Sequence, residues 1–140
     1  TEAYSEANIS AEIAPFFADL PARIAAAHLV IGRAGASTVA ELTVIGRPSI
    51  LVPLPHALDN DQLNNARRLA ESGGAWCIEQ RNLSPERLAD ELEKLLLVPD
   101  ALAAAAKAAK TAGRPDAVRN LADFTLALAD GRKLGTGRDH

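Results

Sequence analysis

The stretch Leu29-Val-Ile-Gly-Arg-Ala-Gly-Ala-Ser-Thr-Val-Ala-Glu41 decides the fold. It begins with three apolar residues, a run that is typical of a strand buried on both faces. Gly32 and Gly35 then predict a turn, and Ser37 or Thr38 predicts the cap of a helix that ends at Gly46. Strand, turn and helix together form a βα corner, where free backbone N–H groups and the positive end of the helix dipole can hold a phosphate.

A second interpretation of this corner needs no ligand. Thr38 and Glu41 have the spacing of a capping box, in which two side chains satisfy the amides at the start of a helix. Glu41 could instead accept hydrogen bonds from a ribose diol, since both roles place a carboxylate near the start of the helix. From the residues alone, both interpretations stay open.

Length and composition set the class of protein. The chain has 140 residues, 48% of them hydrophobic and 24% charged, which predicts one modest globular domain. A net charge of -3 argues against nucleic-acid binding. The single cysteine, Cys77, lies in an apolar run and is expected to be a buried thiol. The chain begins at Thr1 and contains no methionine, so we expect it to be a piece of something longer.

Several common sites are excluded by their motifs. The chain has neither the Gly-Lys-Ser/Thr of a P-loop nor the three-glycine dinucleotide fingerprint. Its histidines lack metal-ligand spacing, and its serines lack the nucleophile-elbow pattern. No apolar run is long enough to span a bilayer, and the start has no signal-peptide pattern, so a cytoplasmic setting is the default expectation.

Strands and helices are expected to alternate along the chain. After the end of a helix in residues 1–8, the predicted elements are a strand Ile9–Ile13, a helix Leu20–Ala27 capped by Asp19, the central corner, a strand Ser49–Pro53, a helix Asp61–Ser72, a strand Ala75–Ile78, a helix that starts at Ser84-Pro85 and buries Leu88, Leu92, Leu95 and Leu96, helices Asp100–Ala112 and Asp116–Ala129, and a fraying tail 130–140. This order predicts an α/β fold, a Rossmann-like parallel sheet with helices on both faces.

Polar residues gather on loops that follow the predicted strands. In such folds ligands bind beyond the carboxyl ends of the strands, which here means the loops 14–19, 32–37 and 54–60. His56, beside Asp59, could orient a phosphate or a sugar hydroxyl, although a loop histidine is more often simply solvated. Gln62 and Asn65 lie three residues apart on one helix face, and their amides suit sugar hydroxyls if they are not solvated as well.

Three motifs together resemble the MurG family of bacterial UDP-N-acetylglucosamine (UDP-GlcNAc) transferases. They are Gly35-Ala-Ser-Thr-Val-Ala-Glu41, Gly46-x-Pro-Ser-Ile-Leu-Val-Pro53, and His56-x-x-Asp59-x-x-Gln62-x-x-Asn65-Ala66, in this order and spacing. Pro15-Phe-Phe-Ala-Asp-Leu20 adds to the match, which runs from about Ile9 to Ala129. The resemblance is specific because separate motifs agree.

The resemblance implies part of the C-terminal, donor-binding domain of a GT-B glycosyltransferase, with residues 1–129 in the partial domain and 130–140 as a flexible tail. It implies that the backbone of Phe17 meets the uracil and that the segment from Gly35 through Ala36, Ser37 and Thr38 caps the diphosphate. It further implies that Glu41 takes the ribose hydroxyls and that Gln62, with Asn65 nearby, holds the GlcNAc, and it includes His56 among the substrate-binding residues. No metal ligand and no cofactor are implied.

The resemblance also implies partners for the complete protein. A family member is an inverting hexosyltransferase that moves GlcNAc from UDP-GlcNAc to lipid I, forming lipid II for peptidoglycan, at the cytoplasmic face of the bacterial inner membrane. The acceptor site, the membrane-facing patch and the general base belong to an N-terminal domain that this chain lacks. We therefore expect no catalytic residue here and no activity from the chain alone.

Two alternatives remain from the sequence. The chain could be a stand-alone donor-binding subunit that needs a separate acceptor subunit. It could also belong to a related GT-B UDP-GlcNAc epimerase, whose catalytic carboxylates this sequence does not obviously place.

Overall fold

A parallel sheet lies at the centre of the structure. The computed structural model describes residues 2–56 and 60–113. Within them, β1 (Val30–Gly32), β2 (Ser49–Leu51) and β3 (Ala75–Cys77) pair in parallel in the order β1-β2-β3. The register places Ile31 opposite Ile50, and Ile50 opposite Trp76. The predicted parallel α/β fold is therefore confirmed, with β1 at one edge of the described sheet.

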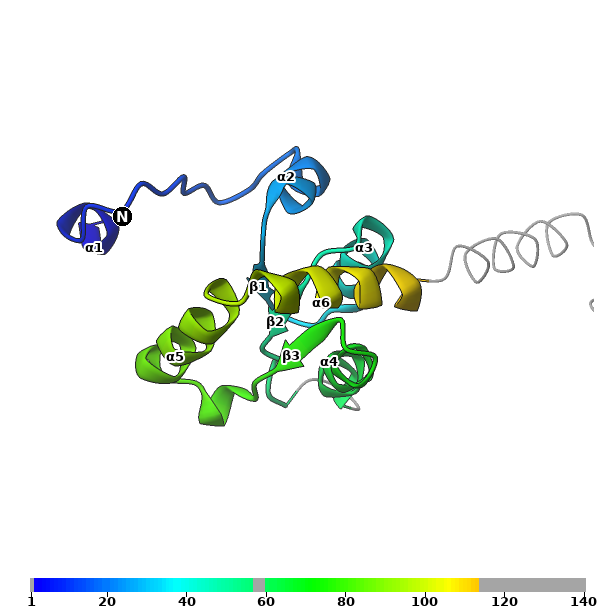
Figure 1. Cartoon of the computed structure of the whole chain (residues 1–140). Helices are drawn as coiled ribbons and strands as arrows, with labels where there is room; N and C mark the ends of the chain where they lie inside the picture. Colours follow the sequence, from blue (N-terminus) through cyan, green and yellow to red (C-terminus); the bar gives the residue numbers. More distant parts are fainter. Residues whose placement is uncertain (1, 57–59, 114–140) are drawn as a thin grey trace, which may run out of the picture.

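Helices follow or precede each strand, as the alternating pattern predicts (Figure 1). Their bounds are α1 (Glu2–Glu6), α2 (Leu20–Ala26), α3 (Ala36–Ile45), α4 (Asp61–Glu71), α5 (Pro85–Leu96) and α6 (Pro99–Ala112), with a 3-10 turn, η2, at Gln80–Asn82. α4 packs against β3, and α3 packs against α6. The predicted helix Asp116–Ala129 and the tail 130–140 lie outside the described residues.

Two apolar clusters flank the sheet because successive strand residues point to opposite faces. Leu51 belongs to the first cluster, with Leu42 of α3, Leu69 of α4 and Ala109 of α6. Ile50, one residue earlier, belongs to the second, which includes Leu95 of α5. Both strand residues are fully buried, and this confirms the prediction of helices on both faces.

The ends of two helices follow the predicted chemistry. The Ser84 side chain accepts a hydrogen bond from the Arg87 amide at 3.0 Å and so caps α5, with Pro85 in the first turn. α3 ends at Gly46, whose φ of 80° is left-handed and favours glycine. A Cβ there would also lie 2.9 Å from the Cβ of Lys110 on α6. Glycine is thus needed at this position for conformation and for space.

Two local predictions are wrong, and a third holds only in part. Residues 9–13 form no strand, because an alternating apolar pattern is not stable as a strand without a partner, and they run exposed along an extended arm (Figure 1). Asp19 is the N-cap residue of α2, as predicted, but its side chain makes no capping hydrogen bond, because its carboxylate pairs with Arg23. Leu96 was expected in the buried stripe of α5 but is 54% exposed.

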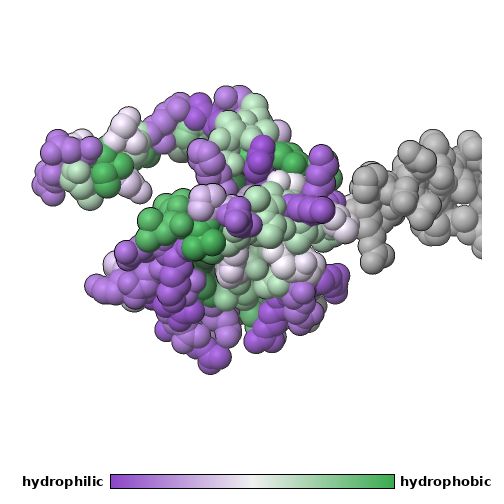
Figure 2. Space-filling model, viewed as in Figure 1, coloured by the Kyte–Doolittle hydropathy of each residue, from purple (hydrophilic) through white to green (hydrophobic). Residues whose placement is uncertain are grey.

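Leu96 belongs to an apolar area at the junction of α5 and α6. Leu97 and Val98, which connect the two helices, are exposed as well. Figure 2 shows apolar surface on the body of the molecule, below the arm that leads from α1 to α2. Ile31 of β1 is also 46% exposed, so the described helices cover the sheet incompletely at β1.

Candidate functional site

The βα corner between β1 and α3 has the architecture that the sequence predicts but a different cap. Gly35, with extended backbone, is the N-cap of α3, and no side chain caps the helix. Ser37 and Thr38 already lie inside the first turn, so the prediction that one of them caps the helix is wrong, and so is the capping box. Glycine is tolerated at the N-cap, and because it has no side chain it leaves the helix amides uncovered. The first three N–H groups of α3 have no partner within the helix.

Gly32 and Gly35 leave open space at the corner. A Cβ built on either glycine would meet no atom within 4 Å. Gly35 has φ -62° and ψ 151°, values that any residue adopts. Neither crowding nor backbone conformation within the described residues therefore requires glycine at Gly35. Close approach of a ligand to the backbone is a physical reason that remains.

Gln62 and Asn65 of α4 reach the corner directly. The Gln62 Oε1 atom accepts hydrogen bonds from the Ala34 amide at 3.3 Å and the Leu54 amide at 2.9 Å. The Asn65 Nδ2 group donates to the Ala34 carbonyl at 3.0 Å. The solvated interpretation of these two amides is therefore wrong. Their contact with a sugar stays a prediction, for which Gln62 Nε2 and Asn65 Oδ1 are the atoms left over.

Arg33 is a site neighbour that the sequence reasoning missed. Its Nη1 group donates to the carbonyls of Val52 and Pro53, at 3.3 and 3.4 Å, across the gap between the loops that follow β1 and β2. An arginine between two glycines at the end of a strand is the signal that could have revealed it. A cation at this position also favours an anionic ligand nearby.

Glu41 lies on the same face of α3 as Ser37. Residues four apart on a helix are neighbours, so the half-buried Glu41 stands one turn beyond the exposed Ser37. Among the described residues, no hydrogen bond or ion pair engages the Glu41 carboxylate. A carboxylate that is not needed for the helix cap can accept hydrogen bonds from hydroxyl groups.

His56 lines a separate hollow at the carboxyl ends of β2 and β3. This cavity of about 290 Å³ is bounded by Pro53, Leu54, Pro55, His56, Asn60, Leu63, Glu79, Gln80 and Arg81. Its link to the corner is Leu54, whose amide donates to the same Gln62 oxygen atom as the amide of Ala34. The predicted neighbour of His56, Asp59, lies outside the described residues. The pairing of His56 with Asp59 stays a prediction.

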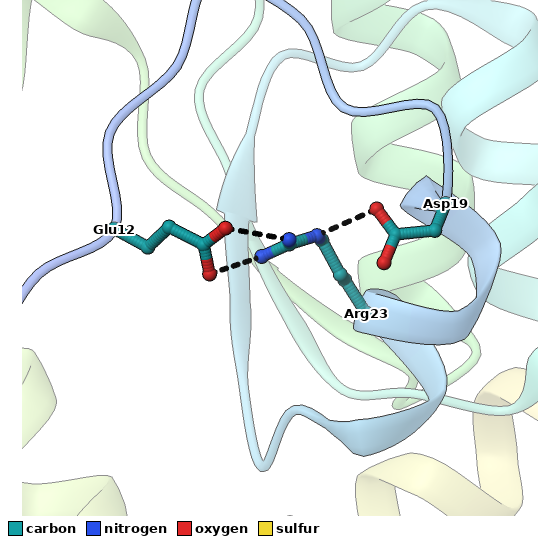
Figure 3. A network of polar contacts seen from close by, with 3 residues as sticks. All are labelled: Glu12, Asp19 and Arg23. Carbon is teal, nitrogen blue, oxygen red and sulfur yellow. Dashed lines mark hydrogen bonds and ion pairs between the residues drawn. The ribbon is translucent and has the colours of Figure 1, made fainter.

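The arm before α2 carries Phe17. The guanidinium of Arg23 lies 4.2 Å from the centre of the Phe17 ring, a cation–π contact. Arg23 also forms two hydrogen bonds of 2.7 Å to the Glu12 carboxylate and one of 2.8 Å to Asp19 (Figure 3). One side chain on α2 thus fixes the arm on both sides of Phe17. The role of Phe17 toward a uracil stays a prediction.

Acid is expected to loosen the arm. The hydrogen bonds from Arg23 lower the pKa of Glu12 and the pKa of Asp19. A carboxyl group with a lowered pKa in the folded state stabilises that state above its unfolded pKa, and loses this contribution as pH falls through the folded pKa. We expect NMR titration of the side-chain carboxyl carbons to give pKa values for Glu12 and Asp19 below the ordinary carboxyl range. In Arg23→Gln both pKa values should return to that range.

The matched control is Arg87→Gln, which removes the arginine of the exposed Arg87–Glu91 pair on α5. This variant should leave the pKa values of Glu12 and Asp19 unchanged. Ordinary pKa values in the unmodified chain would contradict the network in Figure 3.

Neither a metal-binding cluster nor a membrane-spanning helix occurs in the part of the chain that the structure describes. The described residues contain no group of three or more histidine, cysteine, aspartate or glutamate side chains placed to hold a metal ion. None of the helices seen in 2–56 and 60–113 is long and apolar enough to cross a membrane.

Comparison with protein families identifies related proteins over most of the chain. The model of the glycosyltransferase family 28 C-terminal domain matches residues 1–121. A Brucella suis protein named UDP-N-acetylglucosamine--N-acetylmuramyl-(pentapeptide) pyrophosphoryl-undecaprenol N-acetylglucosamine transferase is 55% identical over 133 residues. That match takes in 95% of this chain but 35% of the Brucella protein, so the chain spans about a third of that relative.

Solved structures agree with these relatives. The crystal structure of Acinetobacter baumannii MurG superposes with a TM-score of 0.74 at 34% identity, covering 84% of this chain and 34% of the MurG chain. The crystal structure of the glycosyltransferase VinC in complex with dTDP superposes with a TM-score of 0.63 at 26% identity, covering 87% of this chain and 31% of VinC. The fold at the centre of the site is therefore shared with glycosyltransferases.

Proposed function

The chain belongs to the glycosyltransferase family 28 C-terminal domain family, and from this premise we propose that it is the donor-binding part of a GlcNAc transferase. The complete protein would be an inverting hexosyltransferase that moves GlcNAc from UDP-GlcNAc to lipid I, forming lipid II for peptidoglycan. The name of the Brucella suis relative and its 55% identity support this choice of donor and acceptor.

The open space above Gly32 and Gly35, beside the uncapped start of α3, carries the proposal. A diphosphate in this space would accept hydrogen bonds from the free amides of Ala36, Ser37 and Thr38. The positive end of the helix dipole would stabilise the negative charge that develops on UDP as the glycosidic bond breaks. VinC, whose structure superposes on this chain, was solved in complex with dTDP, which supports a nucleoside diphosphate as the kind of ligand.

We assign the other contacts with UDP-GlcNAc to residues that lie around the βα corner. In our proposal the Glu41 carboxylate accepts hydrogen bonds from the ribose hydroxyls, one turn beyond the diphosphate. The backbone of Phe17 meets the uracil, and Gln62, Asn65 and His56 lie toward the GlcNAc. Free amide atoms on Gln62 and Asn65 suit sugar hydroxyls because an amide both donates and accepts.

In our proposal the acceptor side belongs to the part of the complete protein that this chain does not span. We propose that lipid I, the surface of the inner membrane and the general base are all met there, with the complete protein acting as a peripheral enzyme on the cytoplasmic face. With the functions divided in this way, this chain binds the sugar donor and contains no catalytic residue. This division also fits a chain that covers 35% of its Brucella relative.

Calorimetry with three nucleotide sugars tests the proposed donor. UDP-GlcNAc should bind more tightly than UDP-glucose, which lacks the acetamido group, and much more tightly than GDP-mannose, whose base and sugar both differ. Equal heats and affinities for all three would contradict the donor assignment. UDP alone should compete with UDP-GlcNAc for the same site.

A further inference from the structure

Two loops approach each other at the carboxyl edge of the sheet and are tied together by side chains. The loop after β1 contains Ala34, and the loop after β2 contains Leu54. Gln62 binds the amides of both residues, at 3.3 and 2.9 Å, through one oxygen atom. Since both partners are N–H donors, the oxygen of the Gln62 amide must face them. The side chain therefore bridges two strands' ends from a third element, α4.

Asn65 completes the hold on Ala34. Its Nδ2 group donates to the Ala34 carbonyl at 3.0 Å, while Gln62 accepts from the Ala34 amide. Ala34 is itself fully buried. The two polar groups of one residue are thus fixed by two amide side chains that lie one turn apart on α4. Ala34 immediately precedes Gly35, the N-cap from which α3 begins.

We propose that Gln62 and Asn65 are positioning residues that set the backbone of the diphosphate loop. This inference rests on the proposed function for the identity of the ligand. The amides of Ala36, Ser37 and Thr38 follow Ala34 directly along the chain, so a rotation at Ala34 would displace all of them. Hydrogen-bond donors stabilise a charged group best when they are held in place before it arrives.

Positioning the diphosphate loop is a different role from contacting the sugar. Binding measurements with three ligands of increasing size distinguish the two roles. Uridine has no phosphate, UDP adds the diphosphate, and UDP-GlcNAc adds the sugar. A residue that positions the diphosphate loop affects binding from UDP onward. A residue that acts through the sugar alone affects only the gain in affinity from UDP to UDP-GlcNAc.

The test uses Gln62→Met and Asn65→Leu in the full chain, two changes of similar size that remove the hydrogen bonds without adding charge. We expect each to weaken UDP binding about tenfold. Uridine binding should stay the same, and the gain in affinity from UDP to UDP-GlcNAc should also fall, because the variants remove the amide atoms proposed to face the sugar as well. Asn64→Leu is the matched control, because Asn64 is the exposed neighbour of Asn65 on α4 and should bind all three ligands as the unmodified chain does.

Hydrogen exchange gives a second readout that needs no ligand. The amide of Ala34 should exchange faster in Gln62→Met than in the unmodified chain, because it loses its acceptor. If Asn65→Leu does not fold, Asn65→Ser replaces it, since a hydroxyl keeps a donor but is too short to reach Ala34. The thermal midpoint of each variant shows whether it is folded.

Two results would overturn the proposal. Unchanged UDP binding with loss of the gain on adding GlcNAc would assign both amides to the sugar. An unchanged exchange rate of the Ala34 amide in Gln62→Met would show that Gln62 does not accept a hydrogen bond from Ala34, and so that the bridge does not form. If the unmodified chain bound UDP-GlcNAc no better than GDP-mannose, the proposed function would fail instead, and the exchange data would still decide whether the bridge exists.

Discussion

Glu41→Ala is expected to weaken the binding of UDP-GlcNAc about 10- to 100-fold, the effect of losing hydrogen bonds to a charged acceptor. Glu41 stands half-buried on α3, one turn beyond Ser37, where the ribose of a nucleotide on the helix start would lie. Calorimetry with UDP-GlcNAc measures the loss directly. Uridine, which keeps the ribose but lacks the diphosphate, should lose affinity by a similar factor.

The thermal midpoint of Glu41→Ala should stay close to that of the unmodified chain. Gly35 is the N-cap of α3 and no side chain caps the helix, so Glu41 is not required for the helix start. Alanine also has the higher helix propensity. The matched control is Glu93→Ala, which removes an exposed glutamate from α5 and should change neither quantity. A lower midpoint with unaltered binding would show that Glu41 stabilises the fold instead.

Leu42→Ala is expected to lower the free energy of unfolding by about 2–5 kcal/mol, the cost of deleting buried methyl groups and leaving a cavity. Leu42 is fully buried and lies in the apolar cluster where α3, α4 and α6 meet the sheet. Loss of the Leu42 side chain should destabilise α3, the helix whose first turn forms part of the candidate site. Urea unfolding measures the change, with an unaltered m-value if the unfolded chain exposes the same surface.

Val44→Ala provides the matched control on the same helix. Val44 is 62% exposed, so its truncation leaves no cavity and should change the free energy of unfolding by less than about 0.5 kcal/mol. Equal losses in the two variants would contradict the packing of α3. The comparison also separates burial from helix propensity, because both variants gain an alanine.

Local patterns were sufficient to predict the central corner. An apolar run, two glycines and a helix start lie within the thirteen residues Leu29–Glu41, and the structure builds β1 and α3 from them. The predicted cap was wrong because serine is a better capping residue than glycine by propensity, and threonine an equal one, so local propensity did not favour Gly35. The actual N-cap, Gly35, leaves the first amides of α3 uncovered. Uncovered amides suit the binding of an anion, whereas a side-chain cap would stabilise the helix more.

Predictions failed where the outcome depends on residues far apart in sequence. The alternating pattern of Ile9–Ile13 suits a strand, but a strand needs a neighbour, and that information is not local. Gln62 and Asn65 were predicted as a pair on one helix face, yet their spacing could not reveal that both face Ala34, about thirty residues away. Arg33 escaped notice for the same reason, since its partners are carbonyls of the next loop.

The arm before α2 does not contain the strand predicted at residues 9–13, but it does contain Phe17, a residue predicted to belong to the site. Phe17 was selected through the resemblance, and the structure places it under Arg23 in a segment without regular structure. The contacts of Arg23 with Glu12 and Asp19 bring together residues 11 and 4 positions away. No periodicity in the sequence marks such a three-residue network.

The most direct test of the account is an NMR titration of the full chain with UDP, followed through the backbone amides. We predict the largest shifts at Gly35, Ala36, Ser37 and Thr38, and uridine should not reproduce them because it lacks the diphosphate. Shifts confined to the cavity between Leu54 and Arg81, with the start of α3 unaffected, would contradict the assignment of the βα corner as the diphosphate site.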